Sequence, residues 1–390
     1  MSRLAGRDVT IIGAGIGGLT AALGFARAGA NVTMYEQAPA LTEVGAGLQI
    51  SPNGARALQA LGVAEALDAM GLRAQAVQPM NALTGRPVAR FGLTGQTPPY
   101  RFVYRFDLVS LLHDAAAAAG VRFQFGTRIT GLSEDGAFTT PDGTQRPDLL
   151  VGADGLHSVV RSCLTSTATP FFTRQVAWRA VVPDCPADPI ARIWMGPGKH
   201  VVTYPLRDGA LNVVAVQERK AWAADGWNHA DDPANLRAAF ADCAPDLHAI
   251  LDRIATPHLW GLFRHPVAET WGRGRLALLG DAAHPTLPFL AQGANLALED
   301  AFVLVAALQA NATDAAGLAA YQQHRKPRVT RAIAAATANA RNYHLSGLPA
   351  RIAHLGLSGI SRLAPTAFLS RLSWLYDHDV TAVDYQLAAV

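Results

Sequence analysis

The stretch VTIIGAGIGGLTAALGFARAGANVTMYE, residues 9–36, decides the fold. It opens with four largely β-branched residues, which favour a strand. A glycine-rich turn follows, and apolar residues then recur at helical spacing as far as Gly29, a residue type that commonly ends helices. Residues 31–35 again favour a strand, which ends at Glu36. The stretch therefore predicts a strand, a tight turn, a helix and a second strand.

The turn has the spacing Gly13-x-Gly15-x-x-Gly18, and Glu36 follows the second strand. In dinucleotide-binding turns the glycines permit a tight bend, the helix N-terminus faces the pyrophosphate, and the acid accepts hydrogen bonds from ribose hydroxyls. We therefore expect these four residues to bind a dinucleotide. The pattern alone does not separate FAD from NAD, and no second copy of it occurs in the chain.

Composition excludes several other classes of protein. Half of the 390 residues are apolar, which excludes a disordered chain, and a net charge of +3 gives no reason to expect nucleic acid. The three cysteines form no Cys-x-x-Cys pair, so we expect no disulfide framework, no metal site and a cytoplasmic location. Residues 9–26 are uncharged as in a signal peptide, but their five glycines argue against one, and no other stretch is expected to span a membrane.

Two glycine–aspartate turns at predicted strand ends point to a flavin. Asp154 lies in Gly152-Ala153-Asp154-Gly155, and Asp281 opens a stretch that continues through His284 to Asn295. An aspartate at a strand end can accept from a ribityl hydroxyl, and a helix that begins near Gly293 can aim N–H groups at the O2 side of an isoalloxazine. Either turn alone would be ordinary, but the two together with the first motif favour FAD. His284 is expected to be structural.

The hydrophobic pattern of the sequence changes near residue 171. Alternating runs at 175–182, 191–195, 200–204 and 211–217 predict an antiparallel sheet, whereas from residue 295 the chain is expected to be helical with a break at Pro327. We predict an α/β fold in which a mainly antiparallel sheet is inserted into a Rossmann-like domain. The expected divisions are 1–75, 100–168 and 270–330 for FAD binding, 76–99 and 169–269 for the substrate sheet, and 331–390 for a C-terminal helical segment.

With these residues in place, the chain resembles the flavin-dependent aromatic hydroxylases of the p-hydroxybenzoate hydroxylase fold. It is most similar to the branch that holds salicylate hydroxylase, 3-hydroxybenzoate 6-hydroxylase and 6-hydroxynicotinate 3-monooxygenase. The resemblance rests on residues 43–53, Tyr104-Arg105-x-x-Leu108, 152–161, 280–295, Glu299-Asp300 and 374–377. It implies noncovalent FAD, NADH or NADPH as a transient donor, and O2. It also implies that the flavin is held by Gly47, Arg105, Asp154, Asp281, Gly293, Ala294 and Asn295.

The substrate side is expected on residues 199–205. At a period of two, His200, Val202 and Tyr204 share one face of a strand. In the branch named above, a His-x-x-x-Tyr/Phe-Pro segment supplies the residue near the substrate phenol, so His200 and Tyr204 are expected to be catalytic, with His200 as the phenol base. Gln292 is the second candidate, as an orienter of the substrate or of the oxygen. The hydroxynicotinate branch carries a His where Gln49 stands here, which favours benzoates.

These features predict a single-component FAD monooxygenase that hydroxylates a phenolic aromatic carboxylate, through the flavin C4a-hydroperoxide that the resemblance implies. Two alternatives stay open: an enzyme of the same fold that acts on a larger phenol or epoxidises an alkene, and a flavoprotein reductase that passes electrons to a partner. Neither a membrane nor nucleic acid is expected as a partner, and the chain is expected to be a monomer or a homodimer.

Overall fold

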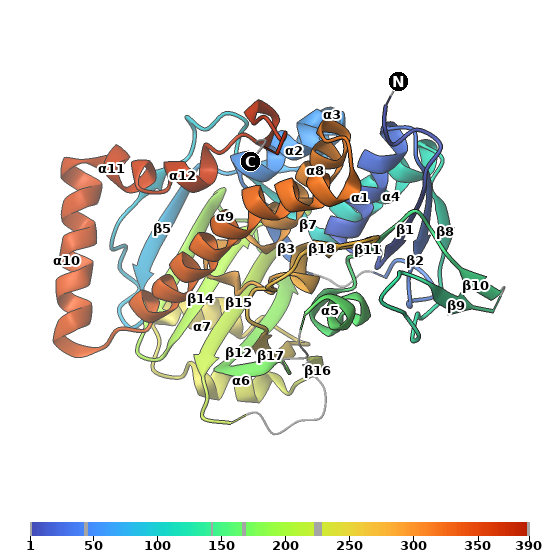
Figure 1. Ribbon diagram of the computed structural model, residues 1–390. Helices are drawn as coiled ribbons and strands as arrows, with labels where there is room; N and C mark the ends of the chain where they lie inside the picture. The colour runs from blue at the N-terminus through green and yellow to red at the C-terminus, as the bar shows by residue number, and fades with distance from the viewer. Residues whose placement is uncertain (1, 43–45, 142, 166–168, 222–227, 388–390) are drawn as a thin grey trace.

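The computed structural model describes residues 2–42, 46–141, 143–165, 169–221 and 228–387. Its first layer is a six-stranded sheet in the order β18-β19-β11-β1-β2-β8, parallel except at the β18 edge (Figure 1). The strands are β1 (Asp8–Ile12), β2 (Asn31–Tyr35), β8 (Arg122–Gln124), β11 (Leu149–Gly152), β18 (Gly272–Arg273) and β19 (Leu276–Leu278). Helix α1 (Ile16–Arg27) connects β1 to β2, so the predicted strand–turn–helix–strand unit is confirmed.

Three long helices pack on this sheet or on one another: α4 (Arg105–Ala118), α8 (Gly293–Ala310) and α9 (Asp314–Tyr343). Helix α1 lies between α4 and α8, and α9 packs on the other side of α8. Helix α8 is long and apolar enough to cross a membrane, which the sequence analysis did not expect of any stretch after residue 26. About 67% of it is buried inside the protein, as a core helix is.

The predicted, mainly antiparallel second sheet is confirmed. Its order is β16-β17-β12-β15-β14-β13-β5-β6, and only the β13–β5 pair is parallel. The strands are β5 (Ala76–Asn81), β6 (Phe91–Gly92), β12 (Phe171–Val182), β13 (Ile190–Gly196), β14 (Lys199–Pro205), β15 (Leu211–Glu218), β16 (Asn228–Ala230) and β17 (His258–Arg264). Strands β5 and β6 lie within the range 76–99, which was expected to belong to the substrate sheet, and both are part of this sheet. The division of the chain into domains stays a prediction.

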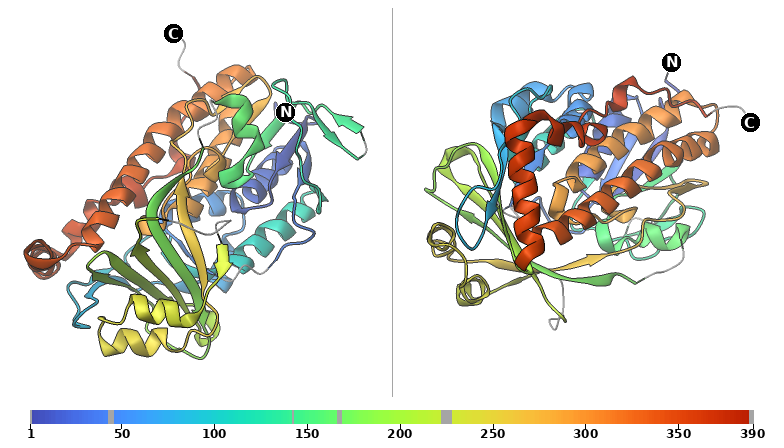
Figure 2. Two further views of the ribbon diagram at one scale, coloured as in Figure 1. Left: turned by 90° about the horizontal axis from the view of Figure 1, so that it is seen from below. Right: turned by 90° about the vertical axis from the view of Figure 1, so that its left-hand side faces the viewer.

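Each face of the second sheet has its own apolar contacts. Helices α6 (Pro233–Ala239) and α7 (Pro245–Leu251) cover the outer face, where Val201 and Val213 pack with Leu236 and Leu247 (Figure 2). The other face carries Tyr204, Val214 and Val216 and belongs to the large core that includes α1, α8 and α9. We call this second face the inner face, and it is the face on which His200 and Tyr204 were predicted.

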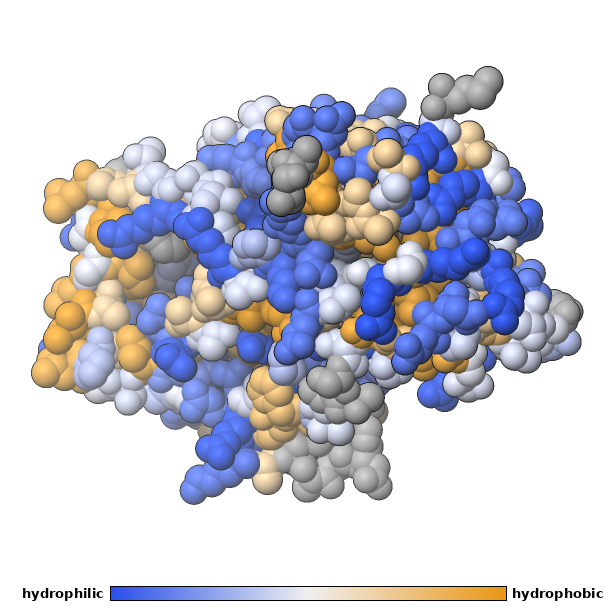
Figure 3. All heavy atoms as spheres, in the orientation of Figure 1, coloured by the Kyte–Doolittle hydropathy of each residue, from blue (hydrophilic) through white to orange (hydrophobic). Residues whose placement is uncertain are grey.

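Short elements complete the described chain. They are β3 (Gly47–Ile50), β4 (Leu72–Arg73), β7 (Arg101–Tyr104), β9 (Phe138–Thr140), β10 (Gly143–Gln145), α2 (Pro52–Ala60), α3 (Ala64–Met70), α5 (Val159–Leu164), α10 (Gly347–Leu363), α11 (Pro365–Ser370), α12 (Ser373–Tyr376) and the 3-10 turns η1 (Gly155–His157), η2 (Arg207–Gly209), η3 (Gly280–Ala282), η4 (Pro288–Leu290) and η5 (Val380–Ala382). Helix α10 buries no side chain, and its exposed apolar residues gather at one edge of the molecule (Figure 3).

The predicted break at Pro327 is wrong, because α9 continues through it. Proline removes one backbone hydrogen bond from a helix, but ion pairs hold the helix on both sides of this position. Arg325 lies 2.7 Å from Asp300 of α8, and Arg328 lies 2.7 Å from Glu299. These contacts to the buried helix α8 keep the two halves of α9 in line. The expected domain boundary at 330 therefore falls inside a helix.

Candidate functional site

The glycine turn after β1 has the shape that a bound pyrophosphate requires. Gly13 has φ of +103°, and a Cβ on it would lie 2.5 Å from the Ala153 carbonyl oxygen. A Cβ on Gly18 would lie 2.0 Å from the Gly13 oxygen, so the helix and the turn pack too closely for any side chain. At Gly15 a Cβ would meet no described atom within 4 Å. The N-terminus of α1 thus faces open space, where its N–H groups can receive an anion.

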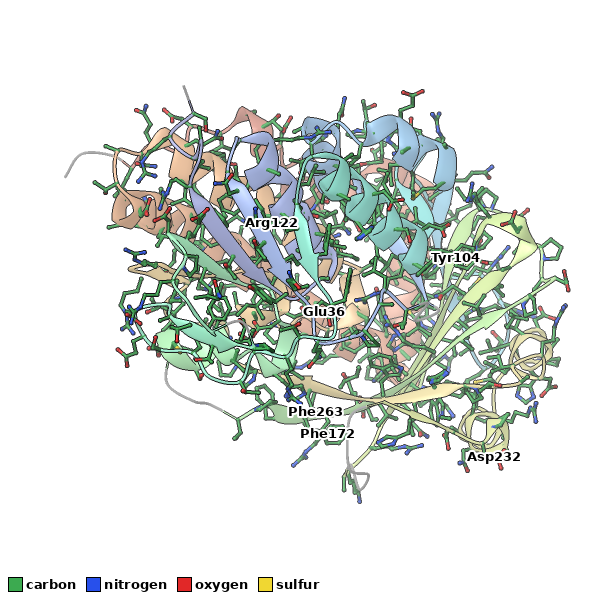
Figure 4. The ribbon with its side chains drawn as sticks, turned by 90° about the vertical axis from the view of Figure 1, so that its right-hand side faces the viewer. Glu36, Tyr104, Arg122, Phe172, Asp232 and Phe263 are labelled. Carbon is green, nitrogen blue, oxygen red and sulfur yellow. The ribbon has the colours of Figure 1, made fainter. Side chains whose placement is uncertain are left out.

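Glu36 closes the other side of this turn, at the end of β2 (Figure 4). Its two carboxylate oxygens accept hydrogen bonds from the backbone N–H groups of Ala14 and Ala38, both at 2.8 Å. Glu36, Ala14, Gly15 and Arg105 line a cavity of about 200 Å³. A carboxylate that already fixes the turn and still borders the cavity is placed to accept from ribose hydroxyls as well.

Asp281, Arg105 and Asp154 are the charged groups of the same region. The Asp281 side chain is exposed, but the protein atoms around it displace water from its carboxylate and so raise its pKa. His284 and Arg105 act in the opposite direction and lower the pKa of Asp281. Burial lowers the pKa of the Arg105 guanidinium, and Asp281 counteracts it. Asp154 accepts from the Val159 N–H at 2.7 Å through Oδ2, while its buried Oδ1 has no partner in the described part of the chain. An unpartnered buried oxygen beside the turn is what a hydroxyl of a bound flavin nucleotide would satisfy.

The N-terminus of α8 is positioned by Ala291, a non-glycine residue with φ of +52°. Asn295 is fully buried: its amide donates to Gln49 O at 2.9 Å and Ala291 O at 2.8 Å, and accepts from the Ser51 N–H at 3.0 Å. Gln292 donates to Ser51 Oγ at 3.0 Å and accepts from Asn53 at 3.1 Å. Both amides therefore join α8 to the start of α2. The functional roles expected of Gln292, Gly293, Ala294 and Asn295 stay predictions, which depend on their position at the N-terminus of α8.

A buried set of charges lies directly behind this helix end. Asn53 donates to Glu299, which also pairs with Arg325 and Arg328, and Asp300 binds His284 at 2.5 Å and Arg325 at 2.7 Å. Burial alone would raise both carboxyl pKa values, but the neighbouring cations lower the pKa of Glu299 and of Asp300 to about 2. His284 stacks on Trp271 and is part of this scaffold, as expected of a structural residue.

His200 and Tyr204 lie on the inner face of β14. The His200 ring is 1% exposed and meets the rings of Phe289 and Tyr343, each with centroids 5.3 Å apart. Tyr204 stacks on Phe102 with centroids 5.0 Å apart, and burial raises its pKa. Gly47 belongs to this contact: a Cβ there would lie 2.7 Å from the Tyr204 ring, and its N–H donates to Asn212 at 2.6 Å. The predicted cofactor role of Gly47 remains a prediction.

Three residues on or next to this inner face were missed by the sequence analysis: Arg179, His344 and Glu218. Arg179 pairs with Val214, which pairs with Val202, so its side chain shares the face of His200 and Tyr204. Its guanidinium lies over Trp260 at 5.6 Å and has no ion pair in the described ranges. His344 lies 2.7 Å from His200, and Glu218 lies 2.7 Å from His344. The strand period could have indicated Arg179, but nothing local in the sequence marks His344.

The residues present fit FAD on the observations above: a turn without room for side chains, an open helix N-terminus, a carboxylate beside a cavity and an unpartnered Asp154 oxygen. Residues 43–45 of the resembling stretch lie outside the described residues. No group of three His, Cys, Asp or Glu side chains able to hold a metal ion occurs in the portion that was described.

Comparison with known proteins confirms the resemblance and the cofactor. A family described as FAD binding domain matches residues 7–336. The chain is 34% identical over 390 residues to 3-amino-4-hydroxybenzoate 2-monooxygenase PtnB3 of Streptomyces platensis, covering 96% of this chain and 97% of that one. It is 33% identical over 394 residues to 3-hydroxybenzoate 6-hydroxylase of Polaromonas naphthalenivorans, covering 95% and 96%. The structure of Klebsiella pneumoniae HpxO complexed with FAD and uric acid is similar, with a TM-score of 0.81, 26% identity and coverage of 93% and 97%.

Proposed function

This chain belongs to the FAD binding domain family, and from that premise we propose that it is a single-component monooxygenase that hydroxylates a phenolic aromatic carboxylate, with NADH or NADPH as donor and O2 as oxidant. Two relatives that it matches over nearly their whole length carry the names of enzymes for hydroxybenzoates. Those names support an oxygenase rather than an electron-transfer reductase. We also propose that the enzyme works in the cytoplasm, as expected from its cysteines.

When bound, FAD supplies the transfer of electrons from the nicotinamide donor and the activation of O2. The protein's own residues bind and prepare the substrate. The observation that carries the proposal is the inner face of the second sheet, which carries His200, Tyr204 and Arg179: a buried imidazole, a phenol and a guanidinium without an ion pair in the described ranges. Such a set provides a base for a phenol and a cation for a carboxylate.

His200 accepts the phenol proton. Burial and the neighbouring His344 hold the pKa of His200 well below its ordinary value, so the imidazole is neutral at neutral pH and its free nitrogen can accept. A phenolate is a stronger nucleophile than a phenol, and its ring is more readily attacked by an electrophilic oxygen. Phe289 of η4 is buried against His200, so it helps to keep water from the reacting ring.

Arg179 binds the substrate carboxylate. Burial lowers the pKa of its guanidinium, since no carboxylate of the described chain pairs with it, and a substrate carboxylate would supply that pair. Removing the charge by Arg179→Met should raise KM for a hydroxybenzoate by about 10- to 100-fold, as expected for a charge-assisted hydrogen bond. The KM for the matching phenol without a carboxylate should change little. Equal losses for both ligands would contradict this role.

The function itself is tested by substrate-stimulated oxidation of NADH and NADPH. Purified holoenzyme is offered a set of hydroxybenzoates, aminohydroxybenzoates and hydroxypyridine carboxylates, and the products are identified. At least one carboxylated phenol should accelerate oxidation of the nicotinamide donor and yield a hydroxylated product in proportion to the donor oxidised. Stimulation by none of them, or oxidation without product at every substrate, would contradict the proposal.

A further inference from the structure

We propose that His344 and Glu218 form a proton relay that carries the phenol proton of the bound substrate from His200 to solvent. The relay deepens the proposed function and rests on it. It adds two residues to the reaction, one on the C-terminal end of α9 and one on the end of β15. His200 touches the substrate, whereas His344 and Glu218 act through His200.

The three side chains form an unbroken line from the interior to the surface. His200 Nδ1 lies 2.7 Å from His344 Nε2, and His344 Nδ1 lies 2.7 Å from Glu218 Oε1. His200 is 1% exposed and the His344 side chain 3%, but the Glu218 side chain is 55% exposed. A proton that reaches Glu218 has therefore reached water, and both transfers occur at ordinary hydrogen-bond lengths.

Backbone contacts fix this line in place. The turn between β13 and β14 holds Gly198 at φ of +65°, and the Gly198 N–H donates to the His344 carbonyl at 3.2 Å. The Glu218 N–H in turn donates to the Gly198 carbonyl at 2.9 Å. The same glycine thus ties the end of α9 to the end of β15. The backbones of His344 and Glu218 are therefore held at a fixed spacing through Gly198.

The proton balance follows from the tautomers. In the starting state His200 carries its proton on Nδ1 and His344 on Nδ1, because Glu218 is acceptor-only when ionised. The phenol proton binds His200 Nε2, the Nδ1 proton passes to His344 Nε2, and the His344 Nδ1 proton passes to the Glu218 carboxylate and then to water. One proton leaves the phenol and one reaches solvent. A proton that returns along the same line restores the starting tautomers.

The groups around His200 and His344 favour transfer of the proton over its retention on either imidazole. The titratable groups that face His200 are His344 and Tyr343, both from the end of α9, and burial raises the pKa of Tyr343. Those that face His344 are His200 and Glu218. Burial lowers the pKa of His344, although Glu218 raises it. A proton on either imidazole is therefore unfavourable and moves outward.

The rate of ionisation of a bound phenol tests the relay without turnover. The probe is 4-hydroxy-3-nitrobenzoate, whose phenolate absorbs visible light, bound to the FAD-loaded protein and taken from acidic to neutral pH in a stopped-flow instrument. Glu218→Gln keeps the hydrogen-bond acceptor but cannot pass on a proton, so ionisation should slow by about 10- to 100-fold, as it should in His344→Gln. Glu269→Gln, at another exposed carboxylate, should behave as the wild type. Unchanged rates in both relay variants would overturn the proposal.

The tautomers provide a second test that does not depend on the substrate. In protein with ¹⁵N-labelled histidine, the imidazole NMR spectra should show His200 and His344 both protonated on Nδ1. Imidazole added to His344→Gly should restore the fast ionisation, which would not occur if His344 only supported the fold. The Nε2–H tautomer at His344 would rule out the relay even if the enzyme hydroxylates a benzoate. A correct tautomer in an enzyme that hydroxylates none would leave the line intact and contradict only the proposed function.

Discussion

His200 lies on a strand of the second sheet, but its side-chain contacts come from segments outside that sheet. Phe289 precedes α8, and Tyr343 and His344 lie at the end of α9, so segments next to the ends of these two helices surround the proposed base. A side chain in this position can be removed without disturbing the glycine turn, Arg105 or Asp281. We therefore expect oxygen activation and ring attack to depend on different residues of the chain.

His200→Ala should separate these two activities. NADH oxidation should continue, while ring hydroxylation slows by about 10²- to 10⁴-fold because the phenol has lost its positioned base. The oxygen that does not reach the ring should appear as hydrogen peroxide. The measurement is the ratio of product to NADH consumed, with peroxide assayed in the same sample. A variant that keeps the wild-type ratio and rate at neutral pH would show that His200 is a structural strand residue.

The sequence could predict His200, Tyr204 and Glu36 because each lies within a local pattern, a period of two or a strand followed by an acid. The strand period could have indicated Arg179 too, but it could not predict His344. His344 meets His200 across 144 positions of sequence, and that distance is closed only by the packing of α9 against the second sheet. Gln292 and Asn295 show the converse: their place near α8 was predictable, but their bonds to Ser51 and Asn53 depend on where α2 lies.

The glycine turn offers a matched pair of substitutions at the scale of one element. Gly18→Ala places a Cβ 2.0 Å from the Gly13 oxygen, so β1 and α1 must separate and the protein should lose both FAD and stability. Gly15→Ala meets no described atom within 4 Å and should fold normally. Its methyl group lies where the pyrophosphate must approach, so FAD affinity should fall by about 10-fold or more, the loss of about 1.4 kcal/mol.

The two variants are compared by flavin content after gel filtration and by thermal unfolding of the apoprotein. Gly15→Ala should have the wild-type apoprotein Tm and reduced flavin, and Gly18→Ala should be low in both. Full flavin retention in Gly15→Ala would contradict the assignment of this turn to the pyrophosphate.

Helix α9 shows why a proline was a poor guide to an element boundary. Proline is expected to break a helix that has no stabilising tertiary contacts. Helix α9 has such contacts, because Arg325 and Arg328 pair with α8 on either side of Pro327. Residues 25 or more positions away decide whether the helix continues. The rest of the element order was predictable because alternation and glycine turns are local, whereas this continuation is tertiary.

Pro327→Ala should stabilise the protein. An alanine restores the backbone N–H that proline lacks and has a helix propensity about 3 kcal/mol more favourable, so an increase of about 1–3 kcal/mol in the free energy of unfolding is expected. Urea unfolding at equilibrium measures it, with Ala335→Gly, farther along α9, as a variant that should destabilise. A destabilised Pro327→Ala would show that the proline serves a contact that the helix needs.

For the whole molecule, the buried charges set how stability depends on pH. The folded pKa values of Glu299 and Asp300 are about 2, below the ordinary 4.5 and 3.8, so at pH values between these limits the unfolded chain binds more protons. The folded pKa values of His200 and His344 are lowered from 6.5, so the unfolded chain also binds more protons below that pH. Both effects have the same sign, and stability falls as pH falls.

The free energy of unfolding should therefore begin to decline as the pH drops below about 6.5 and decline more steeply below about 4.5, each group contributing up to about 1.4 kcal/mol per pH unit. Urea unfolding of the apoprotein across this range measures the slope. His344→Gln should flatten the upper part only, because its histidine no longer titrates. Asp300→Asn should be less stable at neutral pH, since Arg325 and His284 lose a buried partner, and should flatten only the lower part. A wild-type profile that stays level from neutral pH to pH 4 would mean that the two histidines take up protons in the folded protein as readily as in the unfolded chain, which would contradict the lowered pKa values of His200 and His344.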